Sequence, residues 1–501
     1  MLGRLVVVSQ KFYFCKINQN PSKLKKKFVK NLFLLIFLNL LIKPFWVFGI
    51  DRTVQNLTGS GEYGFYFSLF SFSLLFNIIL DLGITNFNNK SLSQNPSLIK
   101  SYLSNIVALK LILALAYGII SLAAALLMGY GKHQLSLLII LIFNQFLLSF
   151  LLYLRSNVSG LQFYTTDSLL SVLDRLVMII LCSLALWGRM FSKPITIEWF
   201  VYTQTFSYLI TTIIVLVVVL IKVGKPSFTL DRNMIMEIAK KVAPFALLGL
   251  LMSVYTRIDS VLLERLLPDG KEQAGIYAQS FRILDAFSNF SLLFSSLLLP
   301  MFSRLIATKE DFLPLLKTSF SLLFVMCMAV TISCYCYSTQ IISSLYHEGN
   351  GFSAGVFSIL ILSFIPASMN FIFGTLLTAN GNLRLLNYVA VIGVCVNVFL
   401  NILLIGHFKA LGAAWANIIT QSLIVTIEVG FCFKIWKFYM TNKDILRYSS
   451  FLVAILAVAY AFFTFNGSWI LRFAGTILSV GLSSLLFGIL SLKQFFKAIK
   501  L

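Results

Sequence analysis

Long apolar stretches, separated by short polar or charged segments, recur along the whole chain. A stretch of about 20 apolar residues is long enough to cross the hydrocarbon core of a bilayer as a helix. Ending such stretches at glycine, proline and charged residues predicts about fourteen membrane-spanning helices. The expected ranges are 28–50, 61–85, 104–128, 134–156, 168–191, 197–222, 241–267, 273–303, 312–343, 352–379, 385–406, 411–434, 446–465 and 468–490.

Composition supports this interpretation and narrows the class of function. The chain has 501 residues, of which 58% are hydrophobic and 12% are charged, too much apolar surface for a soluble domain to bury. Little sequence remains for a soluble catalytic domain, and neither a GxxxxGK[ST] loop nor an HExxH pair is present. We therefore expect a transporter and not an enzyme, without a cofactor or a metal site.

The chain is strongly basic, with 40 Lys and Arg against 18 Asp and Glu. In a soluble protein this balance would suggest a nucleic-acid partner. Here Lys and Arg are concentrated in alternate loops, as the positive-inside rule requires of cytoplasmic segments, so we expect no nucleic acid and two cytoplasmic termini. A basic cluster at residues 23–30 would bind anionic membrane lipids.

The longest charged interior loop divides the chain into two comparable sets of six helices. The expected organisation is a basic cytoplasmic tail (1–27), an N-terminal six-helix bundle (28–222), a cytoplasmic linker (223–240), a C-terminal six-helix bundle (241–437), and two further helices with a cytoplasmic C-terminus (438–501). A weak internal repeat supports this division. Asp51 precedes Gly64 much as Asp259 precedes Gly275, with three more residues in the second copy. Six helices separate the copies, so we expect parallel repeats related by a pseudo-twofold axis along the membrane normal.

Several motifs resemble one known family. They are Tyr63–Tyr66, Asp81–Ile84, Ala274–Tyr277, the Asn-rich segment Asn397–Ile405 and the small-residue run Ala410–Ala416. The chain resembles the Wzx-type O-antigen flippases of the MATE/MOP superfamily over most of its length. The resemblance implies two six-helix bundles facing each other across a central cavity, lined by helices 1, 2, 7 and 8, and alternating access. It also implies a saccharide cargo carried on undecaprenyl diphosphate.

Charged residues inside predicted helices must find a partner, face a cavity or reach the membrane surface, because burial in hydrocarbon is costly. Lys110 and Glu428 lie near helix ends, so we expect both to extend toward the lipid head groups. Asp174 and Arg175 are neighbours and suggest either a structural pair or a functional one.

A second set of charges lies on the predicted helices 28–50, 241–267 and 273–303. Lys43, Arg257 and Arg282, with Arg52 at the outer mouth, would form a cationic cavity for a diphosphate head group, because guanidinium groups bind phosphate oxygens in pairs. Pro44 is expected to bend helix 1 toward this cavity. The alternative is that all of these charges are structural ion pairs. In particular, Arg282 lies three residues before Asp285 and would pair with it on one helix face.

Coupling and sugar-binding candidates complete the sequence analysis. Asp81, Asp259 and Asp285 are candidates for coupling to a proton or sodium gradient, because depth in the membrane lets protonation compete with ion pairing. Tyr66 and Tyr277 offer a flat face and a hydroxyl to a sugar, although tyrosines at the membrane interface are the alternative.

The expected function is therefore a flippase for an undecaprenyl-diphosphate-linked O-antigen or capsular repeat unit in the bacterial inner membrane. Polysaccharide polymerase machinery is an expected partner. The alternative is a cation-coupled multidrug or metabolite antiporter of the same fold, which would place uncompensated carboxylates in its cavity.

Overall fold

The computed structural model describes residues 37–39, 41–95, 99–188, 195–223, 232–437 and 441–490. Within these ranges, every regular element is a helix, as the apolar pattern predicts. The expected N-terminal tail, its basic cluster and part of the expected linker lie outside the described residues.

The elements are named here in chain order. They are η1 (Phe45–Asp51), α3 (Arg52–Leu75), η2 (Asn77–Leu80), α4 (Ile84–Gln94), α5 (Ile99–Leu127), α6 (Lys132–Gly160), α7 (Tyr164–Leu170), α8 (Leu173–Leu186), α9 (Ile197–Val223), α10 (Arg232–Leu266), α11 (Gly270–Ala307), α12 (Leu313–Cys336), α13 (Ser338–Leu345), α14 (Gly351–Leu362), α15 (Phe364–Ala379), α16 (Leu383–Phe408), α17 (Ala410–Trp436), α18 (Asn442–Thr464) and α19 (Trp469–Leu486). Helix α10 begins inside the segment expected to be a linker.

The protein is a multi-pass membrane protein. In the described part of the chain, 12 helices are long and apolar enough to cross a membrane, or up to 13 if the bent segment Phe37–Leu75 with Asn77–Gln94 is counted as one span. The number of about fourteen stays a prediction, because the expected first helix begins before the described residues.

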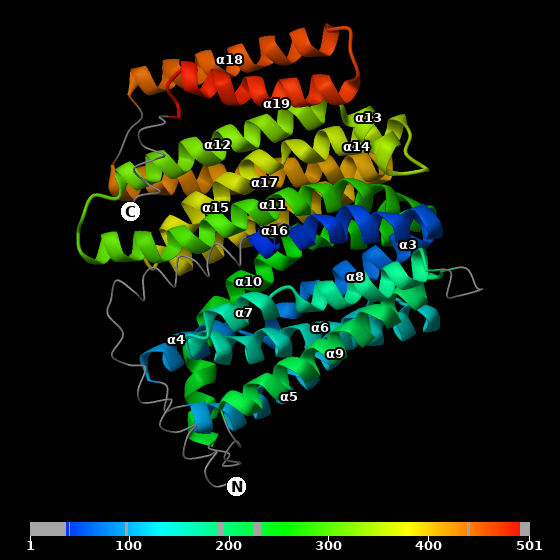
Figure 1. Cartoon of the computed structure of the whole chain (residues 1–501), viewed down its shortest axis with the longest axis vertical. Coiled ribbons are helices and arrows are strands. Elements are labelled where there is room, and N and C mark those ends of the chain that lie inside the picture. Colours follow the sequence, from blue (N-terminus) through cyan, green and yellow to red (C-terminus); the bar gives the residue numbers. More distant parts are fainter. Residues whose placement is uncertain are drawn as a thin grey trace.

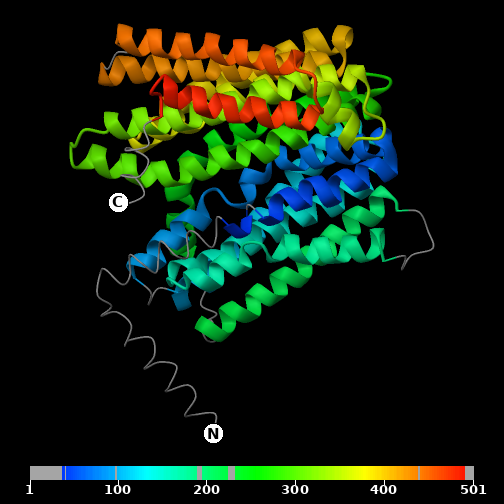
Figure 2. The ribbon, with the colours of Figure 1, turned by 45° about the horizontal axis from the view of Figure 1, so that its top comes forward.

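We call the helices from η1 to α9 the N-terminal lobe and those from α10 to α17 the C-terminal lobe. Figure 1 shows these lobes along the long axis of the molecule, with α5 and α9 near one end and α18 and α19 at the other. Helices α18 and α19 pack against each other and against α12, and the turned view of Figure 2 keeps them at the same end. They therefore cover the outside of the C-terminal lobe, away from the boundary between the lobes.

The lobes meet most closely where α3 crosses α11. A Cβ atom built on Gly64 would lie 1.9 Å from the carbonyl oxygen of Lys271, and one built on Gly275 would lie 2.0 Å from the carbonyl oxygen of Ser60. Only glycine permits backbones to approach so closely, and close approach is a main source of helix association in lipid. The two glycines aligned by the internal repeat thus touch each other across the lobe boundary.

The helix expected at 61–85 is broken. Helix α3 ends at Leu75, η2 follows, and Gly83 adopts a left-handed conformation (φ 92°) before α4 begins. The Asp81 carboxylate accepts hydrogen bonds from the backbone N–H and hydroxyl of Thr85 and thereby holds the first turn of α4.

The expectation that Lys110 and Glu428 reach the membrane surface is wrong. Lys110 is 1% exposed and Glu428 is 3% exposed. The Lys110 ammonium forms an ion pair with Asp81 and also donates to the Leu80 carbonyl and the Ser149 hydroxyl. The helix break therefore supplies Lys110 with internal partners, which makes extension toward lipid unnecessary.

Candidate functional site

Arg282 of α11 reaches across the lobe boundary to groups of the N-terminal lobe. Its Nε donates a hydrogen bond to the Tyr63 hydroxyl at 3.0 Å and lies 3.0 Å from Oδ2 of Asp51. The Tyr63 hydroxyl donates to the same Asp51 oxygen at 2.7 Å. The side chains of Arg282 and Asp51 are only 12% and 2% exposed. A buried ion pair, bridged by a tyrosine, therefore ties the two lobes together.

Two local features of the backbone bring Asp51 to Tyr63. The residues are 12 positions apart, which is about 18 Å along a continuous helix and too far for contact. Gly59, with φ 80° and ψ 164°, interrupts the helix between them. On the other side, the π-helix η1 starts directly after Pro44 and ends at Asp51. A proline removes a backbone donor, and wide turns of this kind often occur at functional sites.

Arg257 of α10 takes the partner that was expected for Arg282. Its Nη2 donates to Oδ1 of Asp285 at 3.4 Å, and its guanidinium carbon lies 4.9 Å from the centroid of the Phe281 ring. The expected pair within α11 between Arg282 and Asp285 is thus wrong, because Arg282 turns toward Asp51 in the other lobe. The contact between Arg257 and Asp285 is long, and the Asp285 side chain is 40% exposed. This pair is therefore weaker than the pair between Arg282 and Asp51.

The N-terminal lobe adds a further cation to the lobe boundary. Arg175 of α8 lies 3.6 Å from the Asp174 carboxylate, measured from Nε to Oδ2, and its guanidinium carbon is 5.4 Å from the ring centroid of Trp46. Its charge interacts with those of Asp51 and Lys43. Asp174 and Arg175 thus form a local ion pair, and whether the pair is structural or functional stays a prediction.

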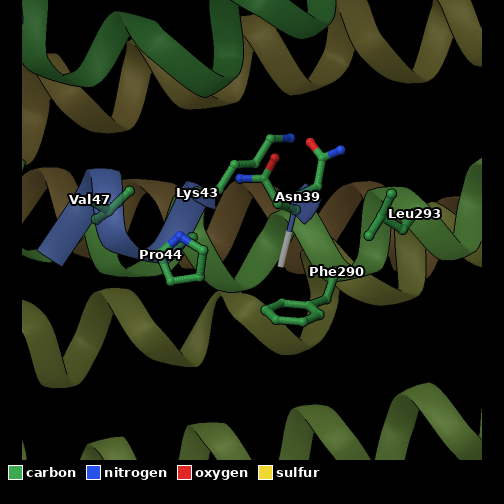
Figure 3. Close-up of a pocket in the computed structure, with 8 residues that line it drawn as sticks. Asn39, Lys43, Pro44, Val47, Phe290 and Leu293 are labelled. Carbon is green, nitrogen blue, oxygen red and sulfur yellow. The ribbon is translucent and has the colours of Figure 1, made fainter. Parts of the chain in front are cut away.

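Lys43 lies at a small cavity between α11 and the helical segment that leads into η1. The cavity is lined by Asn39, Lys43, Pro44, Val47, Ala286, Asn289, Phe290 and Leu293, and Figure 3 shows Lys43 and Asn39 extending to the same side of this segment. Its volume of about 40 Å³ holds only a few water molecules. A diphosphate with attached sugars does not fit in a cavity of this size.

These groups form one electrostatic unit, which we call the interface cluster. It consists of four cations and three carboxylates: Lys43, Arg175, Arg257 and Arg282 with Asp51, Asp174 and Asp285. The structure thus brings together the expected cations Lys43, Arg257 and Arg282. It also supplies counter-ions, which leave a single positive charge uncompensated.

Arg52 lies elsewhere, in a contact between α3 and the C-terminal end of α13 with the segment directly after it. Its Nε donates to the Leu345 carbonyl, to which the Asn56 amide also donates at 2.9 Å. One turn further, the Ser60 backbone N–H donates to the Glu348 carboxylate at 2.8 Å. We call these five residues the gate, because they close the lobes on the side of the Gly59 turn.

Asp259 of α10 is enclosed inside the C-terminal lobe by neutral donors and is 1% exposed. Its Oδ1 accepts hydrogen bonds from the amides of Asn397 (3.1 Å) and Asn401 (2.8 Å). Its Oδ2 accepts from the Asn417 amide (2.9 Å) and the Tyr277 hydroxyl (2.7 Å). This set, which we call the amide cage, explains the Asn-rich motif: three amides from α16 and α17 converge on one carboxylate.

The tyrosines expected to contact sugar are occupied elsewhere. Tyr66 is 1% exposed and its hydroxyl accepts from Gln204, whereas the Tyr277 hydroxyl is bound to Asp259. In this conformation both rings are buried within the packed helices, so neither offers a face to cargo. Asp81 likewise lies outside the interface cluster, in its pair with Lys110.

Sequence analysis named Asp51 in the internal repeat but gave it no role at the site. Asp51 and Asp259 lie at similar but not identical repeat positions, and both carboxylates accept a hydrogen bond from a tyrosine, Tyr63 or Tyr277. The remaining partners differ between the copies, because the N-terminal carboxylate pairs with Arg282 where the C-terminal one has amides. The repeat was therefore the signal that could have marked Asp51 as a site residue.

The chemistry available at the lobe boundary is anion recognition by cations held in place by aromatic rings and carboxylates. The guanidinium carbon of Arg282 lies 5.2 Å from the ring centroid of Phe67 and 5.4 Å from that of Phe70. In the described part of the chain, no group of three or more His, Cys, Asp or Glu residues is arranged to hold a metal ion.

Comparisons with known proteins agree with this architecture. Residues 28–306 match the family described as "Polysaccharide biosynthesis protein". No curated protein sequence matches the chain. Among solved structures, the chain is similar to the lipid II flippase MurJ in an inward closed conformation, with 15% identity and a TM-score of 0.71 over 94% of this chain and 99% of that one.

Other similar structures are transporters of the MOP superfamily. An inward-facing multidrug resistance MATE family transporter has 14% identity and a TM-score of 0.59 over 81% of this chain and 98% of its own. A MOP superfamily transporter from Pyrococcus furiosus has 13% identity and a TM-score of 0.53 over 82% of this chain and 95% of its own. At such identities the likeness establishes the fold. Because the family match spans more than half of the chain and the fold is that of MOP-superfamily transporters, the chain belongs to the polysaccharide biosynthesis protein family.

Proposed function

We propose that the protein is a flippase that moves an undecaprenyl-diphosphate-linked oligosaccharide, an O-antigen or capsular repeat unit, across the bacterial inner membrane. The family match and the likeness to a lipid II flippase support a lipid-linked glycan as the cargo. The protein acts by alternating access, as a transporter and not as an enzyme, without a cofactor. Both termini are cytoplasmic, and polysaccharide polymerase machinery receives the flipped unit.

The observation that carries the proposal is the interface cluster, and Arg282 above all. Asp51 and Tyr63 occupy the Nε side of its guanidinium. Among the described residues, the two Nη groups of Arg282 donate no hydrogen bond. A diphosphate presents several acceptor oxygens, and guanidinium binds phosphate oxygens in pairs. The boundary between the lobes therefore holds a partly unused anion-binding group where cargo must pass.

Cargo binding and lobe movement would be coupled through Asp51. When a diphosphate takes Arg282, the Asp51 carboxylate loses its counter-ion and the tie between the lobes weakens. The Arg257 pair, with its longer contact to Asp285, would exchange partners more readily. The carboxylates thus act as internal substitutes for phosphate, and they keep the buried cations paired when no cargo is bound.

Coupling to a sodium or proton gradient is part of the proposal, with Asp259 as the best placed of the three candidates. Its carboxylate has only neutral partners in the amide cage, and Oδ1 of Asn401 is buried without a hydrogen bond. The two ends of an amide are assigned from hydrogen bonding, and reversed amides would present carbonyl oxygens to a cation. Carboxylate and carbonyl oxygens suit a hard cation. Asp285 and Asp81 already have cationic partners, Arg257 and Lys110.

A cation-coupled multidrug or metabolite antiporter of the same fold is the second candidate function. The observation that favours it is Asp259, a carboxylate that has no ion-pair partner among the described residues, since organic cations require uncompensated negative charge. However, Asp259 is enclosed inside one lobe, whereas the boundary between the lobes carries a net positive charge. The flippase is therefore the better supported function.

The test is deletion of the gene in its native bacterium, followed by mass spectrometry of extracted lipids for glycans on undecaprenyl diphosphate. Rescue is attempted with the wild type, Arg257→Ala and Arg282→Ala. The matched control is Arg304→Ala, the same substitution in the last turn of α11, far from the interface cluster. Membrane insertion of each variant is verified by immunoblotting of the membrane fraction.

Accumulation of a complete repeat unit, with loss of surface polysaccharide, is the expected result of deletion. Arg304→Ala should restore export, whereas Arg282→Ala should not. Unchanged lipid-linked glycans after deletion would reject the flippase and favour the antiporter. Full rescue by both Arg257→Ala and Arg282→Ala would reduce the interface cluster to structural ion pairing.

A further inference from the structure

Glu428 is a buried carboxylic acid of the C-terminal lobe that has no ion-pair partner among the described residues. It lies on α17 with 3% of its surface exposed, and its Oε2 atom is buried with no hydrogen-bond partner. No ion pair of the described residues includes it. An isolated ionised carboxylate in such a place costs many kcal/mol, so the neutral acid is the stable form.

The neighbouring helices form a fitted compartment for this side chain. A Cβ atom built on Gly374 of α15 would lie 3.3 Å from Oε1 and 3.5 Å from Oε2 of Glu428, and 2.9 Å from Oδ1 of Asn370. The missing side chain at Gly374 thus leaves room for the carboxyl group. Tyr255 of α10 adds a hydroxyl that forms a hydrogen bond with the Asn370 side chain. The same hydroxyl interacts electrostatically with Glu428.

The groups facing Glu428 do not supply a compensating charge. Tyr255 on α10 and Cys432, one turn further on α17, are the titratable neighbours, and both are neutral when protonated. Helix α15 contributes the uncharged Asn370 and Gly374. Among the described residues of α11, α14 and α16, which also pack against α17, no charged side chain interacts with Glu428.

Glu428 also shares a helix face with the amide cage. Asn417, Gln421, Ile424 and Glu428 follow each other at intervals of three or four positions on α17, so they form one stripe. The stripe places Glu428 about 16 Å along the helix from Asn417. On α10, Tyr255 lies one helical turn from Asp259 of the amide cage. Two buried carboxyl groups therefore lie along one interior seam, with Glu428 toward the end that is expected to be cytoplasmic.

We propose that Glu428 is a proton-binding site of the C-terminal lobe, occupied in this conformation. The carboxylate takes up one proton and becomes the neutral acid; on release the proton passes to water from the side of the Trp436 end of α17. Proton binding is independent of the cargo. Its use as the coupling step rests on the proposed transport cycle.

The experiment is infrared spectroscopy of the purified, full-length protein in lipid vesicles, titrated with pH in the absence of cargo. A neutral carboxylic acid has a C=O stretch distinct from that of a carboxylate. The wild type should show a titrating band of this kind that Glu428→Gln removes. The matched control Glu272→Gln, at the exposed start of α11, should keep it. Asp259→Asn identifies any separate band from the amide cage.

Two outcomes would overturn the proposal. One is a spectrum of Glu428→Gln that equals the wild type, provided that circular dichroism confirms the helical fold. The other is loss of the band on adding sodium chloride, but not choline chloride, at constant pH, which would make Glu428 a cation ligand. Glu428→Asp keeps a carboxyl group and should retain a shifted band, which separates proton binding from misfolding. Since no cargo is present, failure here is distinct from failure of the flippase assignment.

Discussion

The glycine crossing between α3 and α11 can be tested with one methyl group. A Cβ atom at Gly64 would lie 1.9 Å from the carbonyl oxygen of Lys271 and 2.4 Å from the backbone nitrogen of Gly275, whereas ordinary contact begins at 3.4 Å. Neither obstacle is a flexible side chain. Gly64→Ala therefore forces the two helices apart by about 1.5 Å, the difference between 3.4 and 1.9 Å.

The free-energy cost follows from this displacement. Overpacking in a tight contact costs about 1–3 kcal/mol. In a transporter with two mobile lobes, the closed conformation bears this cost, because separating the lobes relieves the clash without unfolding either of them. A cost of this size corresponds to a shift in population of about 5- to 150-fold toward conformations with an open gate.

Labelling of a cysteine buried at the crossing measures the shift. In a background without native cysteines, Ser60→Cys places the reporter on α3, where the native side chain is 5% exposed and accepts a hydrogen bond from Gln279. The rate of maleimide labelling of the purified protein in detergent should rise by the same factor when Gly64→Ala is added. Gly61→Ala is the matched control, since a Cβ atom there has nothing within 4 Å.

Equal labelling rates for Gly64→Ala and Gly61→Ala, with both proteins folded, would refute the reasoning. The crossing would then not determine which conformation is populated. A fall in melting temperature of Gly64→Ala without faster labelling would also contradict it, because the cost would then fall on the fold and not on lobe separation.

Three further predictions concern groups away from the lobe boundary. Asn401→Leu should lower the free energy of unfolding by about 1–3 kcal/mol, because Asp259 loses a hydrogen-bond donor; thermal unfolding equal to the wild type would contradict the amide cage. Lys110→Met should lower the free energy of unfolding by about 1–3 kcal/mol, because Asp81 and two further acceptors lose a buried ammonium; a second substitution, Asp81→Asn, removes the unpaired charge, keeps an acceptor for Thr85 and should recover part of the loss. The hydrogen bond from Lys409 holds the pKa of Asp269 below its usual range. This pair therefore contributes stability above about pH 4 that is lost as the pH falls through the lower folded-state pKa. Asp269→Asn should flatten the acid limb of a pH profile of thermal unfolding, and an unaltered limb would contradict the pairing.

Apolar length and charge distribution were enough to predict a multi-pass, all-helical membrane protein. Each spanning helix satisfies its own backbone hydrogen bonds, so a run of apolar residues specifies a helix with little help from the rest of the chain. The weak repeat also identified Gly64 and Gly275 as corresponding positions. For the same local reason, the long apolar segments around α5 and α12 were recognised without any knowledge of their neighbours.

The sequence did not predict which partners the charged side chains would have. Lys110 has an ion pair because η2 breaks the helix at Asp81, and Arg282 pairs with Asp51 in preference to Asp285 on its own helix. Both outcomes depend on how helices distant in sequence pack. Helix periodicity states which residues share a face, but it does not state which face of another helix lies opposite.

The sequence by itself thus determined the class of the protein and the types of chemistry it contains: membrane helices, interior cations and an Asn-rich motif. Only the tertiary structure decided that three amides converge on Asp259, that Arg282 bridges the lobes, and that Glu428 has no ion-pair partner in the described part of the chain. The physical reason is the separation along the chain over which each effect acts. The preference of an apolar run for a helix is local, whereas the stability of a buried charge depends on atoms brought to it from other helices.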